Sequence, residues 1–504
     1  MPTFTYQPAL RPDLPHIFGP KEYQEERALF IRIDEILTTS GLEAEFIALA
    51  SEHHGLDSKK LSAKQSEKFC RYTILALRSN IARHFKGMDH RDFCVRLADS
   101  PLLQWFLQIG HLDKVKTFAK STSDRFSRWI SETALRSLND QLIAHLTSPA
   151  SEKTPPPFDL QTPISFDHIY FDSTCLKAPI HFPVDWVLLR DATRTLMKAT
   201  LLIRQAGLRH RMPQEPLHFL SDINTLCMKM TAKNRTKDGK KQRKAVLREM
   251  KTLTKRISKH AEKHLKILTT RSTETDLTPG QISQITQRIE NILAQLPAAI
   301  KQAHERLIGE RKLPNKDKIL SLYDPDVQVI VRGKSGAEVE FGNNLWLGET
   351  REGLIVDYLL EKEKTSDAKQ IQPAIERLVG EQKLPIQNIW GDRGLHSAAN
   401  ETFLENQGIR SGICPKNVSE LSERLQNEPG LRAGLKRRAG TEARISILIR
   451  EFMGKPARAK GFAHRALMVG WAVMSHNLWV IARLEKRSEE DAKAEIQEQI
   501  PEAA

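Results

Sequence analysis

The chain has 504 residues, with 77 Lys and Arg against 62 Asp and Glu, a formal charge of +15 and a pI near 9.5. This length allows two to four domains with large hydrophobic cores. The positive excess attracts polyanions, but charge alone does not choose between DNA, RNA and an anionic membrane.

Cysteine usage argues against a structural zinc site. The cysteines are odd in number, widely scattered and include no C-x-x-C pair. We therefore expect a protein of the reducing cytosol. The five residues are Cys70, Cys94, Cys175, Cys227 and Cys414.

The sequence carries no sign of export or of a membrane span. Residues 1–21 have neither a cationic n-region nor a continuous apolar h-region. The most apolar stretch, residues 466–482, is short and is interrupted by Ser475, His476 and Asn477. We expect this stretch to be a helix buried in a protein core.

The first third of the chain is expected to be helical and to end in a linker. Residues 1–145 carry apolar side chains at three- and four-residue spacing, which predicts an all-α N-terminal domain. Residues 146–164 contain three consecutive prolines, which forbid a regular helix and predict a linker.

An α/β core is predicted next, in two parts. Its first part, residues 165–200, opens with a strand that begins at His168 and ends near Asp172. Residues 201–315 show long helical patterns and are expected to form a basic helical insertion. The second part of the core is expected over residues 316–485.

Short β-rich runs return in this second part, at 327–333, 343–349 and 353–361. The turn between the last two runs, TREG, predicts an antiparallel hairpin.

The chain then alternates between helix and strand. We expect an amphipathic helix at 367–382, a strand that ends at Asp392, a helix stopped by Gly408 and a further short strand. A charged tail is expected over 486–504.

Three carboxylates occupy special positions in this order of elements. Asp172 and Asp392 are each expected at the end of an apolar strand, and Glu442 lies on a late Arg-rich helix. The order β, insertion, β-β-α-β-α-β-α matches a ribonuclease-H-like core, a mixed sheet flanked by helices, in which the two Asp-bearing strands are parallel neighbours. Their ends would place Asp172 beside Asp392, where open α/β sheets hold ligands. A single Asp at a strand end is more often a turn or cap residue. The interpretation as a metal site therefore depends on the placement of all three carboxylates together.

Several segments resemble a known family of enzymes. Residues 319–349, the FDST that contains Asp172, and GTEARISILIREF around Glu442 are similar to bacterial insertion-sequence transposases with a DDE catalytic domain. The likeness extends over most of 165–485. Residues 92–109 and 116–130 also resemble the helical DNA-binding region that precedes that domain.

The family often carries Y-x2-R-x3-E-x6-K around its glutamate. Arg438 and Glu442 match this pattern, whereas Leu435 and Ile449 stand at the tyrosine and lysine positions, with Arg450 next to the latter.

The resemblance implies that Asp172, Asp392 and Glu442 hold two Mg²⁺ ions, which Mn²⁺ would replace. Water would attack a phosphodiester at the inverted-repeat ends of the element, and the freed 3′-OH would then attack target DNA. The implied partners are double-stranded DNA and a second copy of the chain, in the bacterial cytoplasm at the nucleoid.

The strongest electrostatic feature lies at 229–266, with fifteen Lys and Arg against three acidic residues. One interpretation is an arm that follows DNA phosphates, and the other is a solvated helical hairpin. The residues chosen to test it are Lys240, Lys241, Arg243 and Lys244.

Other DNA contacts are expected around the two ends of the chain. Residues 117–130 suit a recognition helix, although core packing alone explains Phe126 and Trp129. His396 either contacts the cleaved phosphate or begins a helix. The remaining candidates for DNA contact are Lys120, Arg125, Arg128, Arg438, Arg444 and Arg450.

Two other classes of protein remain open. A ribonuclease-H-like nuclease or resolvase would share the three carboxylates but act on structured junctions. A non-catalytic DNA-binding protein derived from a transposase would keep the basic surfaces and lose the metal, and the presence of Asp172, Asp392 and Glu442 argues against it.

Overall fold

The structure is a computed structural model, and it describes residues 19–498 apart from 110–113, 148–159, 161–163, 233–237, 335–336 and 455–458. Phe4, Asp13, Leu14 and Ile17 are also described. Most of the expected linker therefore lies outside the described residues. The chain divides into two compact units, residues 1–178 with 343–504, and residues 179–342.

The described part of residues 1–147 is helical, as predicted. Local signals set the helix starts: Ser62 and Gln65 form a capping box at α3, and the Asp89 carboxylate accepts two backbone N–H groups at α4. The helices are α1 (Lys21–Thr39), α2 (Leu42–His53), α3 (Ala63–Phe85), α4 (His90–Asp99), α5 (Pro101–Phe106), α6 (Lys120–Phe126) and α7 (Glu132–Thr147).

These helices do not form a hydrophobic core of their own. The long helix α16 (Phe462–Glu498) packs against α1, α3 and α7, and Trp471 lies in the same apolar cluster as Phe46. The expectation of a separate domain over 1–145 therefore needs correction, because the last helix of the chain completes the core of the first ones. The charged tail expected from 486 continues α16 as far as Glu498.

Helix α16 also contains the apolar stretch at 466–482. In the described part of the chain, Phe462–Leu484 is the helix that is long and apolar enough to cross a membrane, and 72% of its most apolar window is buried inside the protein. The expectation of a buried core helix is confirmed.

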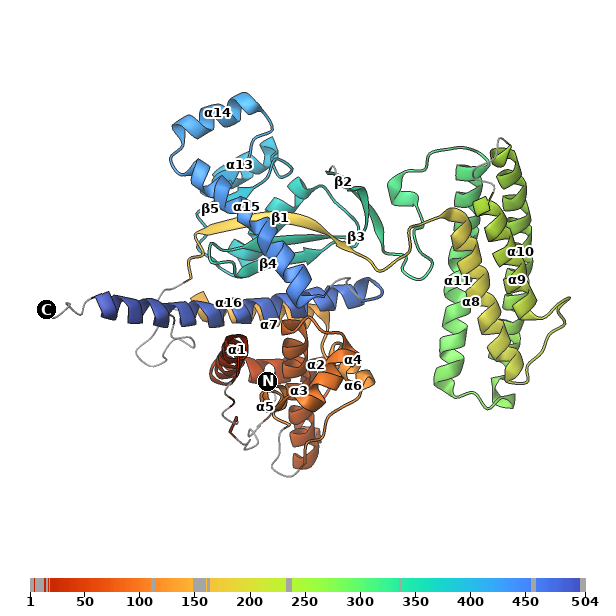
Figure 1. Cartoon of the computed structure of the whole chain (residues 1–504), viewed down its shortest axis with the longest axis horizontal. Helices are drawn as coiled ribbons and strands as arrows, with labels where there is room; N and C mark the ends of the chain where they lie inside the picture. The colour runs from red at the N-terminus through yellow and green to blue at the C-terminus, as the bar shows by residue number, and fades with distance from the viewer. Residues whose placement is uncertain are drawn as a thin grey trace. The chain divides into compact units, whose positions relative to one another are not determined.

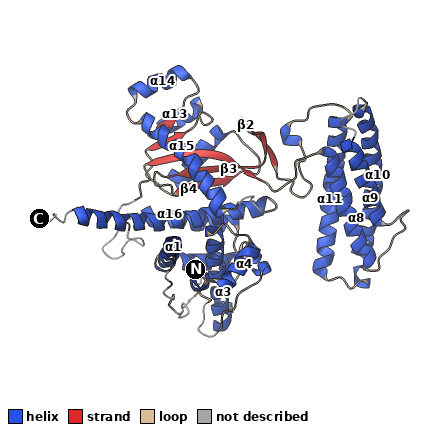
Figure 2. Ribbon diagram, in the orientation of Figure 1, coloured by secondary structure: helices blue, strands red, loops and turns tan. Residues whose placement is uncertain are grey.

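The chain forms a six-stranded mixed sheet (Figure 2), of which residues 328–334 and 337–342 belong to the second unit and the remaining strand residues to the first. The strands run in the order β2-β3-β1-β5-β6, and β4 pairs with β3. Strands β1, β5 and β6 are parallel, whereas β3 is antiparallel to β2 and β4. The predicted hairpin is confirmed. The bounds are β1 (His168–Lys177), β2 (Gln328–Lys334), β3 (Ala337–Glu349), β4 (Ile355–Leu360), β5 (Asn388–Gly391) and β6 (Arg410–Ile413).

Helices follow the strands in the predicted alternation, with one difference. The helix expected at 367–382 is divided into a 3₁₀ turn, Asp367–Gln370, a short α12 and a π-helical turn, Glu376–Glu381. The elements after β4 are α12 (Ile371–Ile375), α13 (Ala398–Asn406), α14 (Val418–Asn427), α15 (Leu431–Ile447) and the π-helical turn Leu448–Phe452.

The second unit is a bundle of four helices with its own apolar core (Figure 1). Its first helix, α8, packs against the other three, so the insertion begins near residue 179 rather than 201 and ends near 342 rather than 315. The sequence places most of α8 in the α/β core, because the apolar stripe of a helix does not reveal which core it covers. The helices are α8 (Asp185–Gln205), α9 (Pro216–Ala232), α10 (Gly239–Arg271) and α11 (Pro279–Leu307).

Helix α15 lies against β1 and β5 at unusually close range (Figure 1). Gly434 is buried against the indole of Trp390, and a Cβ at this position would stand 2.0 Å from the ring. The absence of a side chain therefore sets the distance between α15 and the sheet.

We expect Gly434→Ala to destabilise the first unit by about 1–3 kcal/mol, because the new methyl group overlaps the indole and forces α15 outward. Gly440→Ala, on the exposed side of the same helix, is the matched control and should raise stability by about 0.5–1 kcal/mol through helix propensity. Urea unfolding of both variants measures the difference. Equal effects of the two substitutions would show that the Trp390 contact does not set the helix position.

Candidate functional site

The three predicted carboxylates come from β1, the end of β5 and α15. Asp172 lies within β1 rather than at its end, since this strand continues to Lys177. The expectation of a strand-ending residue is therefore wrong for Asp172, and correct for Asp392, which directly follows β5. Strand β1 is longer because its later residues Cys175 and Leu176 are also buried.

Strand pairing brings Asp172 and Asp392 toward the same end of the sheet. The paired residues run from His168 with Asn388 to Tyr170 with Trp390, and each aspartate lies two residues beyond the last of these pairs. The Asp392 Oδ1 accepts the backbone N–H of Gly394 at 2.9 Å, which fixes the turn after β5.

Arg438 lies between Asp172 and Glu442. Its guanidinium is 3.5 Å from Asp172 Oδ2 and 3.9 Å from Glu442 Oε1, and Glu442 is one helical turn further along α15. The Asp172 side chain is 12% exposed, whereas that of Glu442 is 64% exposed. The site is therefore a buried carboxylate with an exposed one at its rim.

Burial dominates the electrostatics of Asp172 and raises its pKa from the ordinary value of 3.8 to about 6. Arg438 and the N–H of Ser173 act in the opposite direction, and the nearby Asp392 and Glu442 raise the pKa further. The three acids thus share one electrostatic environment, in which additional positive charge would be stabilising.

Carboxylate oxygens are the donors that Mg²⁺ prefers. Across the described residues, however, no group of three or more His, Cys, Asp or Glu side chains is gathered closely enough to hold a metal ion. Arg438 supplies the positive charge at Asp172 in this conformation.

A second, buried carboxylate fixes the helix of the site. Glu349, 1% exposed at the end of β3, accepts the Thr441 hydroxyl at 2.8 Å and lies 3.2 Å from Arg437 and 3.4 Å from Arg444. These three partners span two turns of α15. They occupy the face next to the one that carries Arg438 and Glu442.

Sequence reasoning did not find this interaction. In the sequence, Glu349 is only the last residue of a β-rich run, and the nearest of its partners in the chain, Arg437, is 88 residues away. The one available signal was a glutamate that ends an apolar strand, which is an unusual residue to bury. Arg444, expected at the DNA, is instead held by this carboxylate.

The basic residues proposed for the insertion are mostly engaged within the protein. The ammonium groups of Lys240 and Lys244 lie 2.6 and 2.5 Å from Glu310, and the Arg243 guanidinium stacks over Trp186. Lys241 is exposed.

The remaining candidates for DNA contact lie in the first unit. Lys120, Arg125 and Arg450 are exposed, while Arg128 pairs with Asp124. His396 is mostly buried and lies 3.8 Å from Glu420, before the start of α13.

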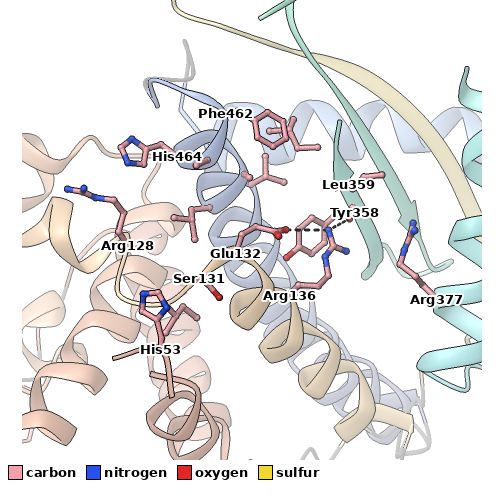
Figure 3. A pocket seen from close by; sticks show the side chains of 16 residues that line it. His53, Arg128, Ser131, Glu132, Arg136, Tyr358, Leu359, Arg377, Phe462 and His464 are labelled. Carbon is pink, nitrogen blue, oxygen red and sulfur yellow. Dashed lines mark hydrogen bonds and ion pairs between the residues drawn. The ribbon is translucent and has the colours of Figure 1, made fainter. Parts of the chain in front are cut away.

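The described residues also line a cavity of about 700 Å³ that is away from the three acids. Figure 3 shows Arg136 extending over the ring of Tyr358, with Glu132 beside it. The walls of this cavity are mainly apolar, and its two arginines are paired, Arg136 with Glu132 and Arg377 with Asp357. We therefore place the candidate site at the carboxylates.

Comparison of the chain with protein-family models, with curated proteins and with solved structures found no match.

Removing the charge of Glu349 tests its role in holding α15. We expect Glu349→Gln to cost about 2–3 kcal/mol of unfolding free energy, because Arg437 and Arg444 lose their buried counter-ion while remaining partly desolvated. Glu35→Gln, which breaks an exposed pair with Arg32, should cost less than about 1 kcal/mol. Denaturant unfolding of both variants decides the matter, and similar costs would contradict the proposed importance of burial.

The raised pKa of Asp172 predicts a pH dependence of stability. The folded protein keeps the proton on Asp172 up to about pH 6, whereas the unfolded chain releases it near 3.8. The contribution of this group to stability is therefore greatest below pH 3.8 and falls as the pH rises to about 6. Asp172→Asn removes the penalty of the buried charge.

We expect the melting temperature of Asp172→Asn, relative to the unmodified protein, to increase between pH 4.5 and 6.5 and to level off above pH 7. Differential scanning calorimetry over this range provides the measurement. A difference that is independent of pH would show that Asp172 ionises without a burial penalty.

Proposed function

We propose that the protein is a metal-dependent DNA transposase of the DDE type, acting at Asp172, Asp392 and Glu442. The observation that carries this proposal is that Asp392, which follows β5, and Glu442 on α15 both act electrostatically on Asp172 of β1, within a strongly basic protein. Acids gathered at one point of a basic protein suit the cleavage of a polyanion, since divalent cations let carboxylates approach phosphate.

The order of the strands supports a ribonuclease-H-like core. Omitting β2, the order is β4-β3-β1-β5-β6, with parallel pairing of β1 to β5 and antiparallel pairing of β3 to β4. This is the arrangement expected from the alternation of strands and helices in the sequence. The four helices of the proposed insertion, α8 to α11, lie in the chain between β1 and β2.

In this proposal, the three carboxylates would hold two Mg²⁺ ions, which would supply Lewis acidity for phosphodiester hydrolysis and for attack by a 3′-OH. Asp172 and Asp392 are fixed by the sheet and by the turn at Gly394. Glu442 is exposed on α15 and lies 3.9 Å from Arg438.

Arg438 has a role of its own in the proposed site. It offsets the negative charge of Asp172 and Glu442, and cations held by the same carboxylates would compete with it. The released guanidinium would then be available for a DNA phosphate, to which Arg binds in bidentate fashion. One side chain would thus couple the arrival of DNA to the exposure of the acids.

The proposed partners are the inverted-repeat ends of an insertion sequence, target DNA and a second copy of the chain. Lys120, Arg125 and Arg450 are exposed and suit phosphate contacts in the first unit. Because Arg444 is held by Glu349, we assign it to the support of α15 rather than to DNA.

Charge-neutral variants of the three acids test the proposal. We expect Asp172→Asn, Asp392→Asn and Glu442→Gln each to reduce Mg²⁺-dependent nicking by at least about 100-fold and to leave DNA affinity within a factor of two, since shape is kept and the charge for the metals is lost. The substrate is labelled DNA from either side of the gene. Glu405→Gln, an exposed carboxylate on α13, is the matched control.

A second readout does not require turnover. Mg²⁺ should raise the melting temperature of the unmodified protein and of Glu405→Gln, and should have a smaller effect on the three variants. Normal nicking by any variant would remove that residue from the site. Cleavage confined to branched DNA would favour a nuclease or resolvase, and specific binding without cleavage would favour a non-catalytic DNA-binding protein.

A further inference from the structure

The four-helix unit contains a cationic groove that the proposed cleavage site does not use. It lies between α8 and α11, has a volume of about 360 Å³ and is open to solvent. Its basic side chains are Arg194 and Lys198, one turn apart on α8, and Arg288 on α11. No acidic side chain is among the residues that line it.

These three cations differ from those proposed on sequence grounds. Lys240 and Lys244 share one carboxylate, Glu310, as their counter-ion. Arg194, Lys198 and Arg288 are exposed, and within the described chain no ion pair engages them. Their charge is available to an anionic ligand.

An aromatic ring stands at the same groove. Tyr323 is 56% exposed, an unusual degree for a large aromatic side chain in a folded unit. Its hydroxyl bonds with Thr195 at 2.9 Å and donates to the Asp191 carbonyl at 3.2 Å, so the ring is held in place from α8. Asp191 itself is paired with Arg190. The groove thus combines a fixed ring with three available cations.

We propose that the α8–α11 groove binds single-stranded DNA, with phosphates at Arg194, Lys198 and Arg288 and one unpaired base stacked on Tyr323. Cationic grooves with an exposed aromatic ring are the common means of binding single strands, because every base has a face that can stack. In a duplex these faces are covered by neighbouring bases, and a groove of this size lies at the lower end of ligand pockets, which suits one nucleotide. This inference does not depend on strand cleavage.

Fluorescence anisotropy with the full chain tests the groove. The probes are a labelled oligo-dT, an oligo-U of equal length and a random duplex, each over a salt series. The groove variant combines Arg194→Gln, Lys198→Gln and Arg288→Gln. For oligo-dT, we expect it to reduce the magnitude of the slope of log affinity against log salt by about 2, since each of the three lost phosphate contacts contributes ~0.7. Tyr323→Leu should weaken oligo-dT binding by roughly 10-fold, because the stacking of one base is lost, and should leave duplex binding unchanged.

Two controls separate this groove from general charge. Tyr323→Phe keeps the ring for stacking but loses the two hydroxyl bonds, so it should bind oligo-dT more weakly than the unmodified protein and more tightly than Tyr323→Leu. Arg248→Gln with Lys259→Gln and Lys263→Gln removes three exposed charges from α10. This triple variant should weaken binding to single-stranded DNA and to duplex DNA by the same factor, so the preference of the protein between the two should not change.

Circular dichroism and thermal melting confirm that each variant folds. Equal loss of duplex and single-strand affinity in the groove variant, or unchanged oligo-dT binding by Tyr323→Leu, would overturn the proposal. Stronger binding of oligo-U with the same Tyr323 dependence would reassign the groove to RNA and likewise overturn it. None of these outcomes bears on the three carboxylates, whose test is metal-dependent nicking.

Discussion

The position of α15 depends on a buried carboxylate that takes no part in the proposed chemistry. Glu349 ends β3 and meets Thr441, Arg437 and Arg444 from successive turns of the helix, so it fixes both the rotation and the axial position of α15. Gly434 against Trp390 sets the remaining degree of freedom, the distance to the sheet. Together these contacts determine that Arg438 faces Asp172. Without these contacts, a helix with the same residues could rotate about its own axis.

The site itself stores an electrostatic imbalance. Asp172 is mostly buried, and its neighbours Asp392 and Glu442 add negative charge, so a proton or a guanidinium at this point lowers the free energy. Arg438 fills that role in the structure. Its contacts at 3.5 and 3.9 Å are longer than a bidentate pair, which is compatible with exchange for another cation.

Periodicity allowed most of the fold to be predicted, because helices and strands are local features. The alternation from β3 to β6, the hairpin at 350–353 and the buried α16 were all predictable in this way. Packing partners were not. The α8 stripe did not reveal which core it covers, and Asp172 looked like a strand end because polar residues follow it. Local charge density also favoured Lys240 and Lys244, whose counter-ion, Glu310, lies more than sixty residues away.

The shared core of the N-terminal helices and α16 has a consequence for synthesis of the protein. His84 bonds with the carbonyl of Phe452, and Trp471 donates to the carbonyl of Ser127, so the first helices emerge from the ribosome more than three hundred residues before their partners. Until residue 484 has been translated, an apolar face of α3 and α7 has nothing to pack against. A chain that ends before α16 would therefore expose this apolar face and be prone to aggregate.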